Sequence, residues 1–256
     1  MKNFLALSLD AYRQYRNFKK QNRVYKIFRY AFYGLFAAYF LTIAFPQYLF
    51  AHEVTHKNFK VYSRQPLDEN IDKVLDSAQA RLAKSTLYDE SKTREIFLTD
   101  SHGFYTFLSN KAYHSFANSV PLLDNILVNK SDIKNDSVFV NQEGINQRSL
   151  SGVIAHEVTH LFIREKFGLR QALVSTPVWK NEGYCDYIAG DGVLTFDEGV
   201  RRWKENPNDD ARYRFFKYHQ MVRYLLEDEK ISIEDLFNKE FDEKELAAKV
   251  FEKISR

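Results

Sequence analysis

The chain of 256 residues contains a single cysteine, Cys185. One cysteine excludes an intramolecular disulfide and a zinc site built from four thiolates. Low-complexity tracts are also absent, and 45% of the residues are hydrophobic and 28% charged. That composition is typical of a folded protein rather than a disordered one. A chain of this length holds one or two domains and can bury a sizeable core.

A strong excess of one charge is missing too, because the net charge is only +3. Residues 1–29 nevertheless contain eight lysines and arginines and one acid, so the rest has 37 − 8 = 29 bases and 34 − 1 = 33 acids, a net charge of −4. A nucleic-acid-binding domain would carry its positive charge on the folded body. We therefore expect no nucleic-acid partner.

Charged side chains are absent altogether from the 22 residues 30–51. As a helix, this run would be about 33 Å long, enough to cross the hydrocarbon core of a bilayer, ~30 Å thick. A cleaved signal peptide is one alternative, although LFA before His52 is a poor cleavage site and the basic lead is long. A buried core helix is another.

We expect the run to be an uncleaved transmembrane signal anchor in contact with the lipid bilayer. The preference for positive charge on the cytoplasmic side then makes residues 1–29 a basic cytoplasmic tail. Residues 52–256 would form a single domain outside the cytoplasm, which in a bacterium would mean the periplasm or the cell surface.

Beyond the anchor, the sequence predicts a small sheet followed by a mainly helical half. Four stretches have the pattern of strands, namely 58–63, 94–100, 124–129 and 136–141, the last two joined by the turn-prone KSDIKND. A helix with one apolar stripe is expected to begin at Pro66, and from about residue 148 the chain is expected to be helical, with breaks near Gly168, Gly190 and 206–208. This order indicates an α+β fold with the functional site at the junction.

The stretch AHEVTH occurs twice, at 51–56 and at 155–160. Each copy contains H-E-x-x-H, which on a helix places two histidines on one face for a zinc ion and a glutamate beside them as general base. The flanking residues of the two copies share no pattern, so the repetition is not an internal repeat. What surrounds each copy decides between them.

The second copy lies in a stretch that is apolar nearly all round, as in a buried helix. His156 and His160 are four residues apart and can share one Zn²⁺, while Glu157 can reach the water bound to the metal. Two histidines and a glutamate buried without partners would be unfavourable, so burial itself favours a ligand. Ser149 or Ser151 is placed to cap the start of this helix, and Gly168 to end it.

A third ligand is available 22 residues further on, in PVWKNEGYCDYIAG. Pro177 begins a helix there, with Glu182 and Asp186 on one face. Glu182 can complete a site of two histidines and one glutamate, and Asp186 can accept the N–H of His156. We expect Cys185 to be a small core residue that points away from the face of Glu182.

The first copy lacks such a context. It follows the apolar run directly and leads into KNFKVYS, which alternates like a strand. The nearest downstream acids, Asp68 and Glu69, are expected at the start of the next helix, so no matching third ligand is available. We interpret this copy as part of a strand or linker, the alternative being a second metal site at the membrane face.

HEVTH followed by NEGYCD resembles the gluzincins, the thermolysin-like superfamily of zinc metallopeptidases, whose signature is H-E-x-x-H with N-E-x-x-x-D. WKNEGYCDYIA is also similar to a stretch in many bacterial membrane-linked members. The resemblance covers roughly residues 138–190. It implies a zincin-like fold, a zinc cofactor and a peptide or protein substrate, with His156, His160 and Glu182 as ligands, Glu157 as general base and Asp186 behind a ligand. The G-A-M-E-N motif of the aminopeptidases is absent, so that activity is not implied.

Relatives also stabilise the oxyanion with a Tyr, His or Arg from a later helix, which makes His219 or Tyr218 a candidate, with ordinary core packing as the alternative for both. Relatives bind the peptide along a sheet edge, for which we expect SVFVN. The sequence thus predicts a membrane-anchored zinc peptidase. The alternative is a membrane-anchored binding or scaffold protein, without enzyme activity, on the same fold.

Overall fold

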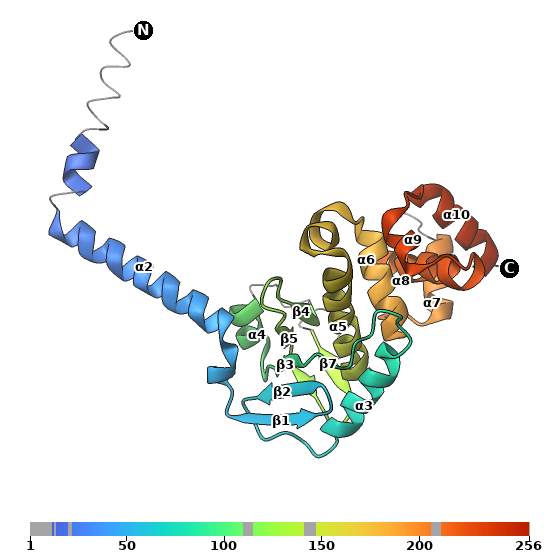
Figure 1. The fold of residues 1–256 in the computed structure, drawn as a ribbon, viewed down its shortest axis with the longest axis horizontal. Coiled ribbons are helices and arrows are strands. Elements are labelled where there is room, and N and C mark those ends of the chain that lie inside the picture. Colours follow the sequence, from blue (N-terminus) through green and yellow to red (C-terminus); the bar gives the residue numbers. More distant parts are fainter. Residues whose placement is uncertain are drawn as a thin grey trace, which may run out of the picture. The chain divides into compact units, whose positions relative to one another are not determined.

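The computed structural model describes residues 12, 14–19, 22–109, 115–140, 147–205 and 211–255. The chain divides into two compact units, Met1–Tyr48 and Leu49–Arg256. The fold is α+β, with an apolar helix near the N-terminus and a small mixed sheet (Figure 1).

The N-terminal unit is dominated by the 22-residue helix α2 (Arg23–Ala44), which is long and apolar enough to span a membrane. None of the residues of α2, which is described throughout, is buried, unlike those of a core helix. The helix begins at Arg23 because the Asn22 side chain accepts a hydrogen bond from the Tyr25 backbone N–H. It ends before Phe45 because Pro46 follows, so the helix covers Arg23–Ala44 and includes only part of the uncharged run 30–51. The short 3₁₀ helix η1 (Pro46–Leu49) follows.

The body is built on a five-stranded sheet with the order β1-β2-β3-β5-β4. Its strands are β1 (His52–His56), β2 (Phe59–Ser63), β3 (Arg94–Leu98), β4 (Ala117–Ser119) and β5 (Ile126–Val128). The pairs β2–β3 and β3–β5 are parallel, whereas β1–β2 and β4–β5 are antiparallel. β4 is therefore an outer strand, and neither it nor helix α4 (His102–Ser109) was predicted.

Alternation along the strands gives the sheet two buried faces. Ile96 and Leu98 of β3 belong to the main core, together with α3 (Ile71–Leu82) and α5 (Leu150–Phe167). Phe97, between them, belongs to a second cluster with Tyr105 and Leu108 of α4. The sheet is thus covered by α3 and α5 on one side and by α4 on the other.

Two details of the first half differ from the sequence prediction. Helix α3 begins at Ile71 and not at Pro66, because the Asp68 carboxylate accepts the Asn70 N–H in a turn that precedes the helix. The stretches 124–129 and 136–141 do not pair, since β5 belongs to the large sheet and β7 (Ser137–Phe139) lies between β6 (Ser131–Asp132) and β8 (Gln147–Ser149) in a separate three-stranded sheet. Residues 137–139 of SVFVN are consequently bonded to strands or segments on both sides, and Asn141 lies outside the described residues.

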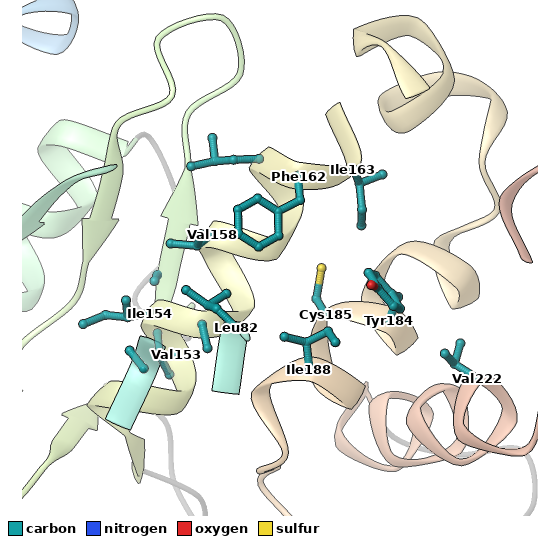
Figure 2. Packing of buried hydrophobic residues seen from close by; sticks show 14 of the residues in the cluster. Leu82, Val153, Ile154, Val158, Phe162, Ile163, Tyr184, Cys185, Ile188 and Val222 are labelled. Atoms are coloured by element: carbon teal, nitrogen blue, oxygen red, sulfur yellow. The ribbon is translucent and has the colours of Figure 1, made fainter. Parts of the chain in front are cut away.

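The second half is helical, as predicted. After α5 come the π-helical turn η2 (Gln171–Ser175), α6 (Val178–Ala189), α7 (Phe196–Glu205), α8 (Ala211–Arg223), the π-helical turn η3 (Tyr224–Asp228), α9 (Ile233–Asn238) and α10 (Glu243–Ile254). The breaks at Gly168 and Gly190 are confirmed, both with positive φ. The predicted break at 206–208 lies outside the described residues. Figure 2 shows the packing between α5, α6 and α8, where Val158, Ile188 and Val222 are buried.

Candidate metal centre

Helix α5 carries the second HEVTH copy through the middle of the main core. Its first turn is capped by Ser149, whose hydroxyl accepts the Gly152 N–H at 3.0 Å, and it ends at Gly168. Almost every residue between is buried, including His156 and Glu157, each 8% exposed. The predicted buried helix is thus confirmed, with Ser149 as its cap.

Helix α6 brings Glu182 to the two histidines. One carboxylate oxygen of Glu182 lies 3.3 Å from Nε2 of His156, and the other lies 3.8 Å from Nε2 of His160. Ligand atoms about 2.0–2.2 Å from a tetrahedral zinc ion are themselves separated by roughly 3.3–3.5 Å. The contact of Glu182 with His156 falls within this range, whereas the contact with His160 is longer.

The opposite nitrogen of each imidazole is held by a fixed acceptor. Nδ1 of His156 lies 2.8 Å from the Asp186 carboxylate. Nδ1 of His160 lies 2.9 Å from Oδ1 of Asn181, and the Asn181 amide is oriented by its own hydrogen bond to the Ala172 carbonyl, 2.9 Å. Both Nδ1 atoms are therefore donors, which leaves the Nε2 atoms with the lone pairs that a metal ion needs.

Cys185 also belongs to this group, contrary to the expectation that it points away. Figure 2 shows its side chain directed from α6 toward α5, and its sulfur lies 3.3 Å from Nδ1 of His160. Residues three apart on a helix are neighbours, so Cys185 shares a side of α6 with Glu182. His156, His160 and Cys185 form a buried group that could bind a metal ion, with one ligand atom of each within 4.8 Å of the others.

The charges around His156 control its protonation. Burial alone would lower the pKa of His156, but the negative charges of Asp186 and Glu182 outweigh burial and raise it to about 10. Burial likewise opposes ionisation of Asp186, whose pKa falls to about 2 beside Arg148 and His156. Without metal, a proton occupies Nε2 of His156 at neutral pH, and a metal ion must displace it.

The Asp186 carboxylate also has a hydrogen-bond partner of its own, Arg148. Arg148 of β8 donates to Asp186 at 3.1 Å and to Asp191 at 2.8 Å, and Asp191 accepts a hydrogen bond from the Ser149 hydroxyl, 2.5 Å. Neither Arg148 nor Asp191 was predicted, because only the fold brings β8 beside the end of α6. The network connects the start of α5 to the carboxylate that orients His156.

Glu157 points to the outer strand of the sheet. Its Oε2 accepts the backbone N–H of Ser119 in β4 at 2.7 Å. This bond fixes the carboxylate and leaves Oε1 as its second acceptor. Ser119 could not be found from the sequence, because β4 has only three residues and no alternating pattern.

A cavity of about 1010 Å³ opens over these groups. Its lining combines the candidate ligands and Glu157 with β4, with apolar side chains such as Phe116, Leu173 and Phe215, and with three arginines, Arg148, Arg164 and Arg223. Of the two predicted oxyanion donors, His219 lines the cavity and Tyr218 does not. Tyr218 is buried, and its backbone carbonyl faces Gly183 of α6. Burial lowers the pKa of His219, against the opposing charge of Asp186, so this side chain favours the neutral form.

The first HEVTH copy forms strand β1, as predicted. On a strand, residues four apart lie about 13 Å from each other, too far for His52 and His56 to bind one ion. His56 is held instead by two carboxylates of α3, Asp72 at 3.3 Å and Asp76 at 2.8 Å. The same five residues thus contribute to a group that could bind a metal ion on α5, and to histidine–carboxylate contacts on β1.

Neither protein-family models nor curated proteins match this chain. The chemistry therefore has to be inferred from the site itself.

Proposed function

We propose that the protein is a zinc-dependent peptidase, with His156, His160 and Glu182 as the metal ligands. The observation that carries the proposal is the convergence of both Nε2 atoms on the Glu182 carboxylate, with both Nδ1 atoms held as donors. Three neutral or anionic donors with one open position are typical of catalytic zinc. Asp186 accepts the Nδ1–H of His156, and Asn181 accepts the Nδ1–H of His160, so each orients its imidazole.

Cys185 is the competing third ligand, and the orientation of His160 disfavours it. The nitrogen that faces the sulfur is Nδ1, which donates to Asn181. For Cys185 and His160 to share an ion, Nδ1 would have to lose its proton and the Asn181 amide would have to turn, breaking its bond to Ala172. Glu182 requires no such change.

Zinc, when bound, lowers the pKa of a water molecule toward ~7 and polarises a carbonyl group. Glu157 then accepts a proton from the attacking water and delivers it to the leaving amine. The Ser119 N–H holds Oε2 of Glu157 in place, so Oε1 is the atom that carries the proton. His219, which lines the cavity, is the candidate for stabilising the oxyanion as it forms.

The cavity fits an extended peptide better than a small metabolite, because β4 is an outer strand along its side. Val120 N–H and Phe116 C=O bond toward the β5 side, to Asn125 and Asn129, so the backbone groups of Ala117 and Ser119 point the other way. Glu157 already engages the Ser119 N–H and the Ser115 hydroxyl engages the Ala117 C=O, so a substrate peptide would add along this edge through the Ala117 N–H and the Ser119 C=O, with Glu157 beside it. This assigns to β4 the role that the sequence suggested for SVFVN.

The proposal includes a membrane location. Helix α2 would hold the protein in the bilayer as a single-pass anchor, with the basic residues that precede it on the cytoplasmic side and the peptidase domain on the other. The alternative, a membrane-anchored scaffold without enzyme activity, keeps the fold and the anchor but requires neither zinc nor hydrolysis.

The deciding experiment is the zinc content of the full-length protein purified in detergent, by elemental analysis. We expect near one zinc per chain, lost in Glu182→Ala and kept in Cys185→Ser and His52→Ala. Loss in Cys185→Ser with retention in Glu182→Ala would assign the ion to the thiolate set instead. Absence of zinc from every form would favour the scaffold.

Catalysis is tested separately with Glu157→Gln. This variant should keep its zinc but cleave a mixed peptide library about 10²–10⁴-fold more slowly, the usual contribution of a general base. Equal cleavage by Glu157→Gln and the natural protein would exclude Glu157 as the base.

A further inference from the structure

Arg164 lies in the same cavity as the metal-binding groups and has no role in the chemistry above. It is four residues beyond His160 on α5, so it is on the face that carries His156 and His160. Its side chain is only 8% exposed, and it lines the cavity. A guanidinium group carries five N–H donors, and burying it without acceptors is unfavourable.

The acceptors around Arg164 are few and distant. Nη1 donates to the Ser119 hydroxyl at 3.2 Å, and Nη2 lies 3.4 Å from the Asp124 carboxylate. Among the residues that the structure describes, no acceptor lies within hydrogen-bonding distance of its buried Nε. The contact with Asp124 exceeds the 2.7–2.9 Å typical of a charge-assisted hydrogen bond, so the positive charge is incompletely paired.

The two other arginines of the cavity differ in this respect. The Nε of Arg148 is also buried without an acceptor among the described residues, but its terminal nitrogen donates to two carboxylates, at 3.1 Å from Asp186 and 2.8 Å from Asp191. The side chain of Arg223 is 42% exposed, so water solvates it, and its carboxylate partner is Glu227 one turn on. Arg164 is the one of these three that is both buried and weakly paired.

The Asp124 carboxylate, which contacts Arg164, is placed so that another carboxylate can replace it. Its side chain is 57% exposed and stands on the loop between β4 and β5, where Leu122 and Asp124 both have positive φ, 72° and 54°. Left-handed backbone at a leucine is strained. A solvated carboxylate on a strained loop loses little when another carboxylate takes its place.

From these contacts we infer that Arg164 binds a carboxylate group of the substrate, in competition with Asp124. The inference rests on the proposed peptidase function and specifies its substrate class. Ser119 contacts both Arg164 and Glu157, so the carboxylate belongs to a residue within one or two positions of the scissile bond. An extended peptide advances about 3.3 Å per residue, so a nearby residue of the substrate can reach Arg164.

Two substrates carry such a group. An aspartate or glutamate side chain would make the protein an endopeptidase selective for acidic sequences, whereas the terminal α-carboxylate would make it release short C-terminal fragments. The two are distinguished by four pools of labelled octapeptides, which contain a central Glu or Gln and end in a free acid or an amide. Binding of each pool to the zinc-stripped full-length protein is measured by fluorescence anisotropy, and cleavage by the zinc-loaded protein by mass spectrometry.

We expect the pools with the recognised carboxylate to bind on the order of 10- to 100-fold more tightly than the neutral Gln-amide pool. Arg164→Gln should abolish this preference, and Arg164→Lys should restore it only in part, because a lysine cannot form two parallel bonds. Arg223→Gln, which removes the same charge from the same cavity, should retain it. Asp124→Asn should strengthen binding of the acidic pools, since it removes the competitor. Circular dichroism checks that each variant is folded.

Equal binding of all four pools to the natural protein would overturn the inference, as would an equal loss in Arg164→Gln and Arg223→Gln. Cleavage without preference would leave the peptidase and refute the carboxylate site. Preferential binding of the acidic pools without cleavage of any pool would support the carboxylate site at Arg164 and refute the peptidase function, because binding requires Arg164 but not hydrolysis.

Discussion

At the scale of single residues, the candidate metal centre contacts groups that are not themselves candidate ligands. Arg148 is one such group, because its guanidinium contacts both Asp186, the partner of His156, and Asp191, which accepts a hydrogen bond from Ser149 at the start of α5. Arg148→Gln should weaken zinc binding about 10- to 100-fold, as loss of an outer partner of a metal ligand usually does. Competition with a fluorescent chelator measures this. Arg223→Gln is the matched control, and an equal loss there would refute a specific role for Arg148.

The protonation of His156 gives a second prediction at this scale. Its pKa is raised to about 10 in the absence of metal, above the value of an unfolded histidine, so the proton stabilises the folded state fully below ~6.5. That stabilisation is lost as the pH rises toward 10, by at most about 1.4 kcal/mol per pH unit. Denaturation at pH 6.5, 8 and 9.5 should show the fall in chelator-treated protein.

With zinc on Nε2 no proton remains to be lost there, so the zinc-bound protein should show a much smaller change over the same range. A slope that is the same with and without chelator would contradict the assignment of Nε2 as a ligand atom. His156→Gln, which cannot titrate, supplies the matched control.

Much of the site could be predicted from residue spacing. The four-residue separation of the histidines and the positions of Glu182 and Asp186 on the next helix were enough to bring these groups together, because both helices have readable ends at Ser149, Gly168 and Pro177. The role of each in chemistry stays a prediction. Cys185 was misplaced because residues three apart on a helix were treated as facing apart, although they are neighbours.

At the scale of elements, the position of α6 depends on its close approach to α8. A Cβ added at Gly183 would lie 2.5 Å from the Tyr218 carbonyl oxygen and 2.8 Å from Cγ2 of Val222. Gly183→Ala should therefore destabilise the fold by about 1–3 kcal/mol and move Glu182 relative to α5. Urea denaturation and zinc titration measure the two effects.

Gly103→Ala is the control, because nothing lies within 4 Å of a Cβ placed there in α4. It should be neutral or stabilise the protein by up to about 1 kcal/mol, as expected for alanine in place of glycine in a helix. If Gly183→Ala behaved like Gly103→Ala, the α6–α8 contact would not be tight.

The elements themselves were predicted unevenly, for physical reasons. Long helices with capping residues were found, whereas β4 and α4 were missed because a three-residue strand and an eight-residue helix have too few positions to show a period. The sequence could not predict which strands pair, since β5 and β7 have similar apolar runs but belong to different sheets. The missed strand β4 is the one that contacts Glu157.

At the scale of the whole molecule, α2 leads us to expect that the protein associates with membranes. The full chain should float with liposomes and require detergent for extraction, because α2 is long and apolar enough to span a bilayer. Replacing Leu35 and Phe36 by arginine, at about +2.5 to +3.5 kcal/mol each on insertion scales, should release it. Leu35→Val with Phe36→Leu is the matched apolar control.

Orientation is tested in the same preparation. In sealed vesicles with the cytoplasmic face outward, added protease should remove the basic N-terminal residues and spare the body. Digestion of the body instead would place the candidate metal centre in the cytoplasm and contradict the proposed location.

The hydrogen bond between the Asn181 amide and the Ala172 carbonyl has one further consequence. It makes the π-helical turn η2 an outer support of His160, although no atom of η2 is a candidate ligand. A Co²⁺ ion in place of zinc absorbs visible light according to the geometry of its ligands. The visible spectrum of bound Co²⁺ would therefore change when the backbone of η2 moves, because η2 orients Asn181 and Asn181 orients His160.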